Sequence, residues 1–235
     1  MQFSKPLPKF DPRSIAVQGV DDHLEGVGQD RLTPSALRQR FALPPVWKPE
    51  HSIEKKFDDR EPTAAAVLIP LVMRNEIMLL LTQRAGHLST HAGQIALPGG
   101  RTDDSDVNAV DTALREATEE IGLPRSHAEV LGTLPLYVTG TAYIITPVVA
   151  LIKPGFELKP NPDEVADVFE VPLGYLMNPA NHQRHAVEFD GVTREWLSMP
   201  YLDNSLQLED GALTERFIWG ATAGMLRNLY RFLSA

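Results

Sequence analysis

The stretch LPGGRTDDSDVNAVDTALREATEEIGL, residues 97–123, limits what the chain can fold into more than any other part of the sequence. A glycine pair at 99–100 and a polar loop lead into a run that favours a helix. At 100° per residue, the apolar side chains within 110–121 lie on one side of this helix, whereas three acids gather on another: Glu116, Glu119 and Glu120. The helix therefore has one face that packs on a core and one face that presents carboxylates.

The end of this helix brings its acids together. Gly122 follows where a left-handed cap is expected, and Pro124 prevents continuation. Carboxylates near a helix C-terminus oppose the helix dipole and repel one another, at about 0.3–1 kcal/mol each when exposed. Arg115 neutralises only part of this charge, whereas a divalent cation that prefers oxygen ligands would turn the repulsion into coordination. A solvated acidic face is the plain alternative, but it does not require the preceding glycine pair.

Runs typical of strands surround the acidic helix. Residues 64–73 and 76–84 are apolar and are predicted to form a hairpin that turns at Arg74-Asn75, and residues 129–140 and 142–152 are predicted to be further strands. Residues 162–177 suggest a capped helix start or turn, a short strand and another helix. Near the C-terminus a helix is expected from apolar spacing at Ile218, Ala221, Met225, Leu226, Leu229 and Phe232. The sequence thus predicts an α/β (α+β) protein with a strand-rich centre.

The first part of the chain has a different character. Residues 1–60 are rich in proline and charge, and one helix is predicted at 33–42, where Thr33 caps and Pro34 takes the first helical position. We predict a partly helical N-terminal extension over 1–60 and one domain over 61–235, and we expect residues 1–30 to be dispensable for folding.

Composition narrows the partners. The chain has 235 residues and a formal net charge of −9, which repels a phosphate backbone, so we expect neither nucleic acid nor an anionic membrane as the partner. The absence of cysteine excludes disulfides, thiolate catalysis and zinc–thiolate sites, and it fits a reducing cytoplasm. The apolar run at 64–73 is too short to span a bilayer. We therefore expect a soluble cytoplasmic protein with a small-molecule substrate.

The glycine pair and the run REATEEIGL, residues 115–123, resemble the signature of the Nudix hydrolases. That signature runs Gly, five residues, Glu, seven residues, then Arg-Glu-(apolar)-x-Glu-Glu-x-Gly-(apolar). Two positions depart from it: Asp106 stands where Glu is expected, and eight residues instead of seven separate it from Arg115. The resemblance implies a Nudix-type α/β/α sandwich with a mixed central β-sheet over residues 61–235.

A second element resembles the coenzyme A pyrophosphatase branch of this family, which also shows the longer spacing before Arg115. The matching positions within residues 80–100 are Leu80, Leu81, Thr82, Arg84, Ala85, Gly93, Pro98, Gly99 and Gly100. Ser89 stands where that branch has Arg, and Leu97 where it has Phe. The resemblance implies hydrolysis of coenzyme A or its thioesters to adenosine 3′,5′-bisphosphate and (acyl-)4′-phosphopantetheine.

The resemblance also implies roles for individual residues. Its metal ligands are Glu116, Glu119 and Glu120, with Mg²⁺ as the metal and Mn²⁺ as a substitute, because all the ligands are oxygen. Its catalytic residues are Glu119, Glu120 and Arg115, which orients the acids by an ion pair; Glu164 is a candidate to assist the water, with a helix cap as its plainer role. Its substrate contacts are Arg84, Gly99 and Gly100, although the glycine pair equally serves a sharp loop.

Several alternatives stay open. His87 and His91 have the spacing of a zinc pair, but no suitable third ligand follows, so we prefer solvent or substrate contacts for both. The enzyme alternative is a Nudix pyrophosphatase for ADP-ribose, NADH or another nucleoside diphosphate derivative. A catalytically silent ligand-binding Nudix module is less favoured, because it is expected to lose the metal acids. The sequence decides neither the acyl preference nor whether a homodimer forms.

Overall fold

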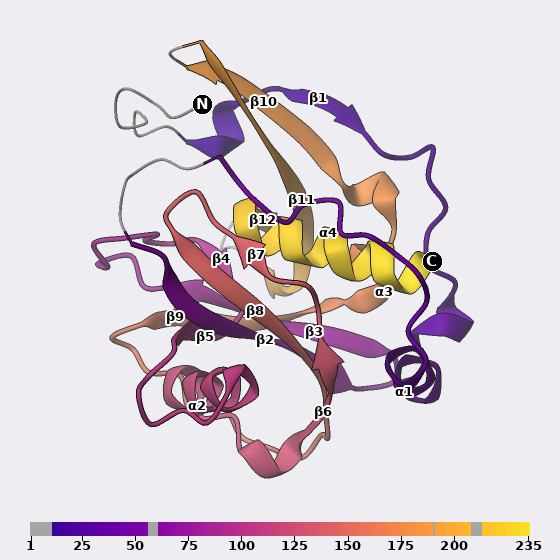
Figure 1. Cartoon of the computed structure of the whole chain (residues 1–235), viewed down its shortest axis with the longest axis vertical. Helices are drawn as coiled ribbons and strands as arrows, with labels where there is room; N and C mark the ends of the chain where they lie inside the picture. The colour runs from indigo at the N-terminus through magenta and orange to yellow at the C-terminus, as the bar shows by residue number, and fades with distance from the viewer. Residues whose placement is uncertain (1–10, 56–60, 190, 208–212) are drawn as a thin grey trace.

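The structure, a computed structural model, describes residues 11–55, 61–189, 191–207 and 213–235 (Figure 1). Within these ranges the chain forms an eight-stranded sheet and a separate four-stranded sheet. The strands of the large sheet are β2 (Thr63–Met73), β3 (Ile77–Arg84), β4 (Ile95–Ala96), β5 (Gly99–Arg101), β6 (Ala128–Thr133), β7 (Tyr137–Val138), β8 (Tyr143–Ile152) and β9 (Val165–Pro172). Its main path runs β4-β3-β2-β8-β6, while β5 pairs with β2, β7 with β8 and β9 with β3.

The large sheet is mixed, as predicted. Strand β2 pairs in parallel with β8 along ten residue pairs, and it pairs antiparallel with β3 and β5. The β2–β3 hairpin turns at the expected place, because Met73 lies opposite Ile77. The antiparallel pairing of β5 with β2 places Gly99 opposite Val67 and Gly100 opposite Ala66. The glycine pair is therefore fixed on the central strand of the sheet.

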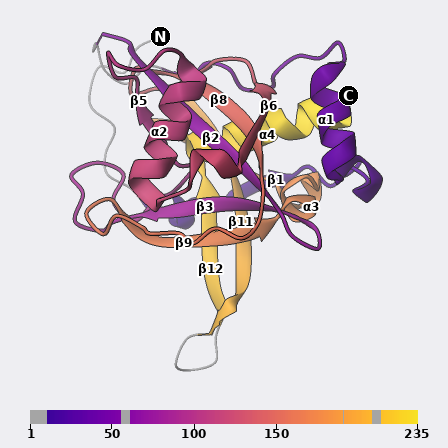
Figure 2. The same cartoon turned by 90° about the horizontal axis from the view of Figure 1, so that it is seen from below.

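Helix α2 (Ala109–Ile121) covers one face of this sheet (Figures 1 and 2). Its apolar side packs on the alternate sheet residues that point toward it, and the buried members of this core are Ala66, Leu68, Val72, Leu80, Ala113, Ala117, Ile121, Leu123, Val148, Ala150, Ile152 and Val165. Alternation along the strands decides which side chains belong to this core. The two strongest predicted elements, the helix and the hairpin, thus pack directly on each other.

Helix α4 (Gly220–Ser234) covers the opposite face. The other alternate residues of the sheet, such as Val67, Leu79 and Leu151, form a second core with Leu226 and Leu229 of this helix. Helices therefore lie on both faces of a mixed sheet, which confirms the predicted α/β/α arrangement.

The four-stranded sheet was missed by the sequence interpretation. Its strands are β1 (Val17–Val20), β10 (Gln183–Phe189), β11 (Val192–Gln207) and β12 (Leu213–Trp219), in the order β1-β10-β11-β12. Figure 2 shows β11 and β12 running past β3 and β9. Buried Arg216 of β12 joins the two sheets, because it pairs with Asp167 of β9 at 2.6 Å and donates to Gln83 of β3 at 3.1 Å.

One local prediction was wrong. Ile218 lies on strand β12, and the C-terminal helix begins only at Gly220. At Ile218 the apolar spacing fitted a helix, but pairing with a neighbouring strand decided the structure. Of the two alternatives for the start of the segment that contains Glu164, the structure has the turn: residues 162–164 form a turn before β9, so Glu164 does not lie at a helix start.

Residues 11–55 are integrated into the fold. Helix α1 (Pro34–Ala42) has the predicted cap, since Thr33 Oγ1 accepts a hydrogen bond from the Ala36 N–H. Strand β1 pairs with β10, and Val27 and Leu32 are buried in the core with α4. This packing argues against the expectation that residues 1–30 are dispensable; residues 1–10 lie outside the described ranges.

The remaining elements are short. They comprise α3 (Leu173–Leu176) and the 3-10 helices η1 (Pro12–Ser14), η2 (Gln29–Leu32), η3 (Arg125–His127) and η4 (Pro179–Asn181). In the described parts of the chain, no helix has the length and apolar character needed to cross a membrane.

Candidate active site

Helix α2 and strand β5 position the acidic residues. Asn108 caps the helix at its start, and Gly122 ends it in the left-handed conformation at φ 68°, as predicted. Strand β5 lies between β2 and the helix surface, and it brings the glycine pair against the acids. The helix face predicted to present carboxylates therefore faces the two glycines of β5, which carry no side chains.

Glu120 is the buried acid of the group, with only 5% of its surface exposed. Its Oε2 accepts a hydrogen bond of 3.2 Å from the backbone N–H of Gly99. Burial raises the pKa of Glu120 to about 8; the Gly99 N–H and the charge of Arg84 act against this shift, whereas Glu116 and Glu164 add to it. Glu120 is thus a desolvated carboxyl with acidic neighbours and one fixed donor.

Glu116 lies against the other glycine of the pair. A methyl group built on Gly100 would come within 2.5 Å of the Glu116 carboxylate, so a side chain at position 100 would displace this acid. Burial raises the pKa of Glu116, and the adjacent Arg115 acts in the opposite direction. The absence of a side chain at Gly100 therefore makes the space in which this carboxylate lies.

Arg115 holds three acids at once. It donates to both carboxylate oxygens of Asp106 at 2.9 Å, and its Nη1 lies 3.0 Å from Glu116 Oε1 and 2.9 Å from Glu119 Oε2. Asp106, the residue that departs from the family signature, is thus directed to Arg115. Glu119 is more exposed than Glu116 and is engaged by the same guanidinium.

The acids suit a hard divalent cation. Glu116 and Glu120 are mostly buried, and the negative charges of the acids around them repel their carboxylates. The nearby Arg115 and Arg84 offset only part of this repulsion, and a divalent cation would offset more of it. In the described residues, no three His, Asp or Glu side chains already converge into a group that would hold an ion. Glu119 would complete such a group by leaving Arg115. The donor set fits Mg²⁺ or Mn²⁺, with Glu116 and Glu120 as its fixed part.

Glu164 approaches the same place from the turn before β9. The backbone N–H of Asn161 in this turn donates to the carbonyl of Glu120 at 2.8 Å, which ties the turn to the end of α2. The Glu164 carboxylate is exposed, accepts a bond of 3.4 Å from Asn161 Nδ2, and raises the pKa of both Glu116 and Glu120 by its charge. An exposed carboxylate beside the buried acids is free to meet a water molecule.

A pocket of about 520 Å³ opens on the far side of the glycine pair from α2. Gly99, Gly100 and Arg84 line it, so it reaches the acids through the backbone of β5. The Nε of Arg84 is buried and has no hydrogen-bond partner. A buried guanidinium donor without a partner fits an anionic group of a ligand.

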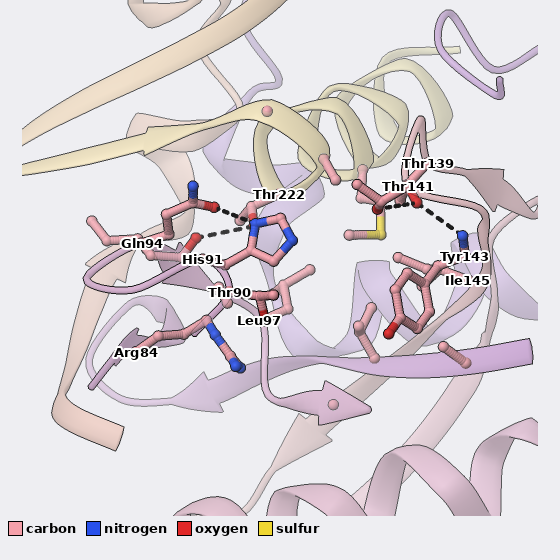
Figure 3. Close-up of a pocket in the computed structure, with 18 of the residues that line it drawn as sticks. Arg84, Thr90, His91, Gln94, Leu97, Thr139, Thr141, Tyr143, Ile145 and Thr222 are labelled. Carbon is pink, nitrogen blue, oxygen red and sulfur yellow. Dashed lines mark hydrogen bonds between the residues drawn. The ribbon is translucent and has the colours of Figure 1, made fainter. Parts of the chain in front are cut away.

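The two sheets and α4 build the walls of this pocket. Figure 3 shows Arg84, Thr90, His91 and Gln94 on one side and Thr139, Thr141, Tyr143 and Ile145 on the other, with α4 above them. Sequence reasoning missed most of these residues because the loops after β3 and β7 that carry them have no periodic pattern that points to a ligand. Trp219, at the end of β12, also lines the pocket.

The residues that depart from the coenzyme A element lie in different settings. Leu97 is buried and lines the pocket, whereas Ser89 is exposed in the loop between β3 and β4. The histidines of that loop do not face each other: His87 Nε2 contacts the carbonyl of Asp163 at 3.1 Å, and His91 Nδ1 contacts Gln94 Oε1 at 3.0 Å. Their contacts agree with the preference for roles other than zinc binding.

Comparisons with known proteins identify the family. Residues 62–196 match the NUDIX domain. The chain is 43% identical over 166 residues to the protein named Uncharacterized Nudix hydrolase NudL of Escherichia coli (strain K12), with 70% of this chain and 80% of that protein covered. It is 42% identical over 175 residues to the protein of the same name from Shigella flexneri, with 73% and 84% covered.

The chain is also similar to solved structures. A Nudix hydrolase from M. smegmatis, RenU, is 26% identical with a TM-score of 0.42, over 52% of this chain and 78% of that chain. A MutT/nudix family protein from Enterococcus faecalis is 15% identical with a TM-score of 0.42, over 86% and 75%. On the domain match and the sequence identity to its relatives, the chain belongs to the Nudix hydrolase family.

Proposed function

We propose that this Nudix hydrolase is a metal-dependent enzyme that cleaves the phosphoanhydride bond of coenzyme A or its thioesters. The products are adenosine 3′,5′-bisphosphate and (acyl-)4′-phosphopantetheine. The observation that carries the proposal is the meeting of two sites at the glycine pair: the acids of α2 on one side, and a pocket with the buried Arg84 donor on the other.

Each residue has a part in the proposed reaction. Mg²⁺, with Mn²⁺ as substitute, would be held by Glu116 and Glu120 with Glu119, and when bound it neutralises phosphate oxygens and makes a water acidic. Arg84 Nε donates to a phosphate oxygen of the substrate. Arg115 holds the acids in place between one catalytic cycle and the next. Glu164, exposed beside these acids, accepts the proton of the attacking water.

The choice of coenzyme A depends on the element at residues 80–100. Four of its residues, Arg84, Leu97, Gly99 and Gly100, line the pocket, so the element resembling the coenzyme A branch is located where a substrate would bind. We also propose that residues 61–235 form the hydrolase domain, that residues 1–60 are an attached extension, and that the enzyme acts in the cytoplasm.

A substrate panel tests the proposal. The purified protein is incubated with Mg²⁺ or Mn²⁺ and with coenzyme A, acetyl coenzyme A, ADP-ribose, NADH or diadenosine polyphosphates, and the products are separated by chromatography. We expect the highest kcat/KM for coenzyme A or a thioester, with adenosine 3′,5′-bisphosphate among the products and no turnover in chelator. Efficient cleavage of ADP-ribose without cleavage of coenzyme A would overturn the substrate and leave the family unchanged.

A further inference from the structure

The pocket has a charged end that belongs to neither the acids nor the coenzyme A element. Glu54 and Arg194 both line it, and both also line an adjoining cavity of about 170 Å³. Glu54 comes from the segment that follows Trp47, whereas Arg194 comes from β11 of the smaller sheet. Glu54 precedes the stretch that matches the NUDIX domain, residues 62–196.

Glu54 is held firmly in place. Its Oε1 accepts a hydrogen bond of 2.8 Å from the Tyr137 hydroxyl, and its Oε2 accepts one of 2.9 Å from the Gly140 N–H. Its backbone N–H donates to the carbonyl of Val138 at 2.8 Å. Upstream, Asn228 of α4 accepts hydrogen bonds from the N–H groups of Glu50 and His51 at 2.9 and 3.1 Å. Residues 50–54 are therefore anchored at both ends, and Glu54 is a fixed part of the pocket wall.

The charge of Arg194 is matched to Glu54. Burial lowers the pKa of Arg194, and the negative charge of Glu54 acts against that effect. Together the two side chains present a donor and an acceptor with no net charge. A phosphate at this end would meet the Glu54 carboxylate, and a cation would meet the Arg194 guanidinium, so a neutral group with both donor and acceptor atoms fits best.

Much of the pocket wall is apolar. Val67, Leu97, Ile145 and Met225 line it, and Figure 3 shows Leu97 between Arg84 and Thr139. The pocket therefore offers a cation at the glycine pair, an apolar passage and a neutral polar end. This order matches a chain with a phosphate at one end and uncharged amides beyond it.

On the basis of the proposed function, we infer that Glu54 and Arg194 are specificity-determining residues that bind the uncharged, amide-bearing arm of 4′-phosphopantetheine. The adenosine 3′,5′-bisphosphate half of the substrate carries a further phosphate, and the Glu54 carboxylate disfavours it at this end. This pocket would then hold the 4′-phosphopantetheine half of coenzyme A, and the adenosine 3′,5′-bisphosphate half would lie outside it.

Calorimetric titration with the two product halves tests the assignment. In Glu54→Gln and in Arg194→Gln, the affinity for 4′-phosphopantetheine is expected to fall about 10-fold or more, the effect of losing a hydrogen bond to a charged group. The affinity for adenosine 3′,5′-bisphosphate is expected to stay within about twofold of the wild-type value. The KM for coenzyme A is expected to rise, because the variants lose a contact to the pantetheine arm. Glu61→Gln and Arg231→Gln, at exposed positions, are the matched controls.

Each outcome decides the matter. A loss confined to adenosine 3′,5′-bisphosphate, or no loss for either half, overturns the inference even when the wild type cleaves coenzyme A. A wild type that leaves coenzyme A intact overturns the proposed function and this inference together. If a variant does not fold, hydrogen exchange on the wild type replaces it: 4′-phosphopantetheine should protect residues 50–55 and β11, and protection by the adenosine half alone overturns the assignment.

Discussion

The backbone N–H of Gly99 donates a 3.2 Å hydrogen bond to Oε2 of Glu120, and this bond joins the glycine pair to the buried acid of α2. It is the link between the pocket on one side of β5 and the carboxylates on the other. Because the donor is backbone, its position depends on the pairing of β5 with β2 and not on a side-chain rotamer.

Replacing Glu120 should affect activity and stability in opposite directions. Glu120→Gln removes a proposed metal ligand, so we expect kcat to fall by about 10²–10³-fold. It also removes a buried carboxylate whose ionisation burial opposes, so without metal the variant should be more stable by about 1–2 kcal/mol. Metal-dependent turnover and thermal unfolding in chelator measure the two effects. Near-normal turnover in saturating Mg²⁺ would contradict the metal assignment.

The glycines provide a graded comparison. In Gly100→Ala the new methyl meets the end of the Glu116 side chain, which can move, so the fold should persist while Mg²⁺ affinity and kcat fall. In Gly99→Ala the methyl meets the backbone of Ala66 and Val67 at 2.4 and 2.6 Å, so the protein itself should lose stability. Gly86→Ala has open space and is the control. Equal effects of all three in unfolding and kinetic assays would contradict this reading.

A buried histidine predicts acid sensitivity. His182 Nε2 contacts the Leu176 carbonyl at 2.8 Å, so Nδ1 is the acceptor that faces Arg227 Nη1 at 2.9 Å, and burial lowers the pKa of His182 to about 4. Between pH 6.5 and pH 4, His182 binds a proton in the unfolded chain but not in the folded chain. The free energy of unfolding should therefore fall by up to about 1.4 kcal/mol per pH unit over this range. His182→Gln should flatten this slope in urea titrations between pH 7 and 4.5, whereas exposed His23→Gln should not.

Glu50 adds a second, lower pH range in which stability depends on pH. Burial opposes its ionisation, but hydrogen bonds from Arg227 and Arg184 outweigh burial and lower the pKa of Glu50 to about 2. The stability from this ionised group is complete above pH 4.5 and is lost as the pH falls toward 2. Glu50→Gln should therefore reduce the pH dependence of stability below pH 4.5 and leave the pH range of His182 unchanged. An unchanged slope below pH 4.5 would contradict the assignment.

The N-terminal segment should be needed for stability. Removal of residues 1–30 takes away β1, Val27 and Asp21, which pairs with Arg184 at 2.7 Å and with buried Arg227 at 3.0 Å. We expect an insoluble protein or a much lower Tm. Asp21→Asn alone should cost about 1–3 kcal/mol, because charged partners lose a buried acceptor. Exposed Asp22→Asn is the control, and a stable truncated protein would contradict the packing argument.

Much of the site could be predicted because its signal is local. The spacing of apolar and acidic residues along 110–121 fixes which side of α2 packs on the sheet, and Gly122 ends the helix wherever the helix lies. The hairpin at Arg74-Asn75 likewise depends on neighbouring residues. The mixed sheet and the helices on both faces were predicted through the resemblance that these local motifs carry.

Other parts of the molecule depend on partners far along the chain. Strands β10 and β11 pair with each other and with β1 and β12, and β1 lies more than 160 residues away along the chain. The sequence of β10 and β11 alone did not indicate these pairings. Ile218 fitted a helical spacing, but pairing with Met199 placed it on a strand. Here backbone hydrogen bonds between distant segments outweighed local preference.

The sequence by itself determined the acidic helix, the glycine pair that precedes it and the protein family. The helix could be predicted because its apolar and acidic side chains recur with the helical period, and the family because these motifs lie close together in the sequence. Only the tertiary structure decided that Asp106 is held by Arg115, that Arg84 keeps a buried donor without a partner, and that Glu54 and Arg194 meet in one pocket. Those contacts join segments whose approach depends on the packing of two sheets and α4, and such packing is a property of the whole chain.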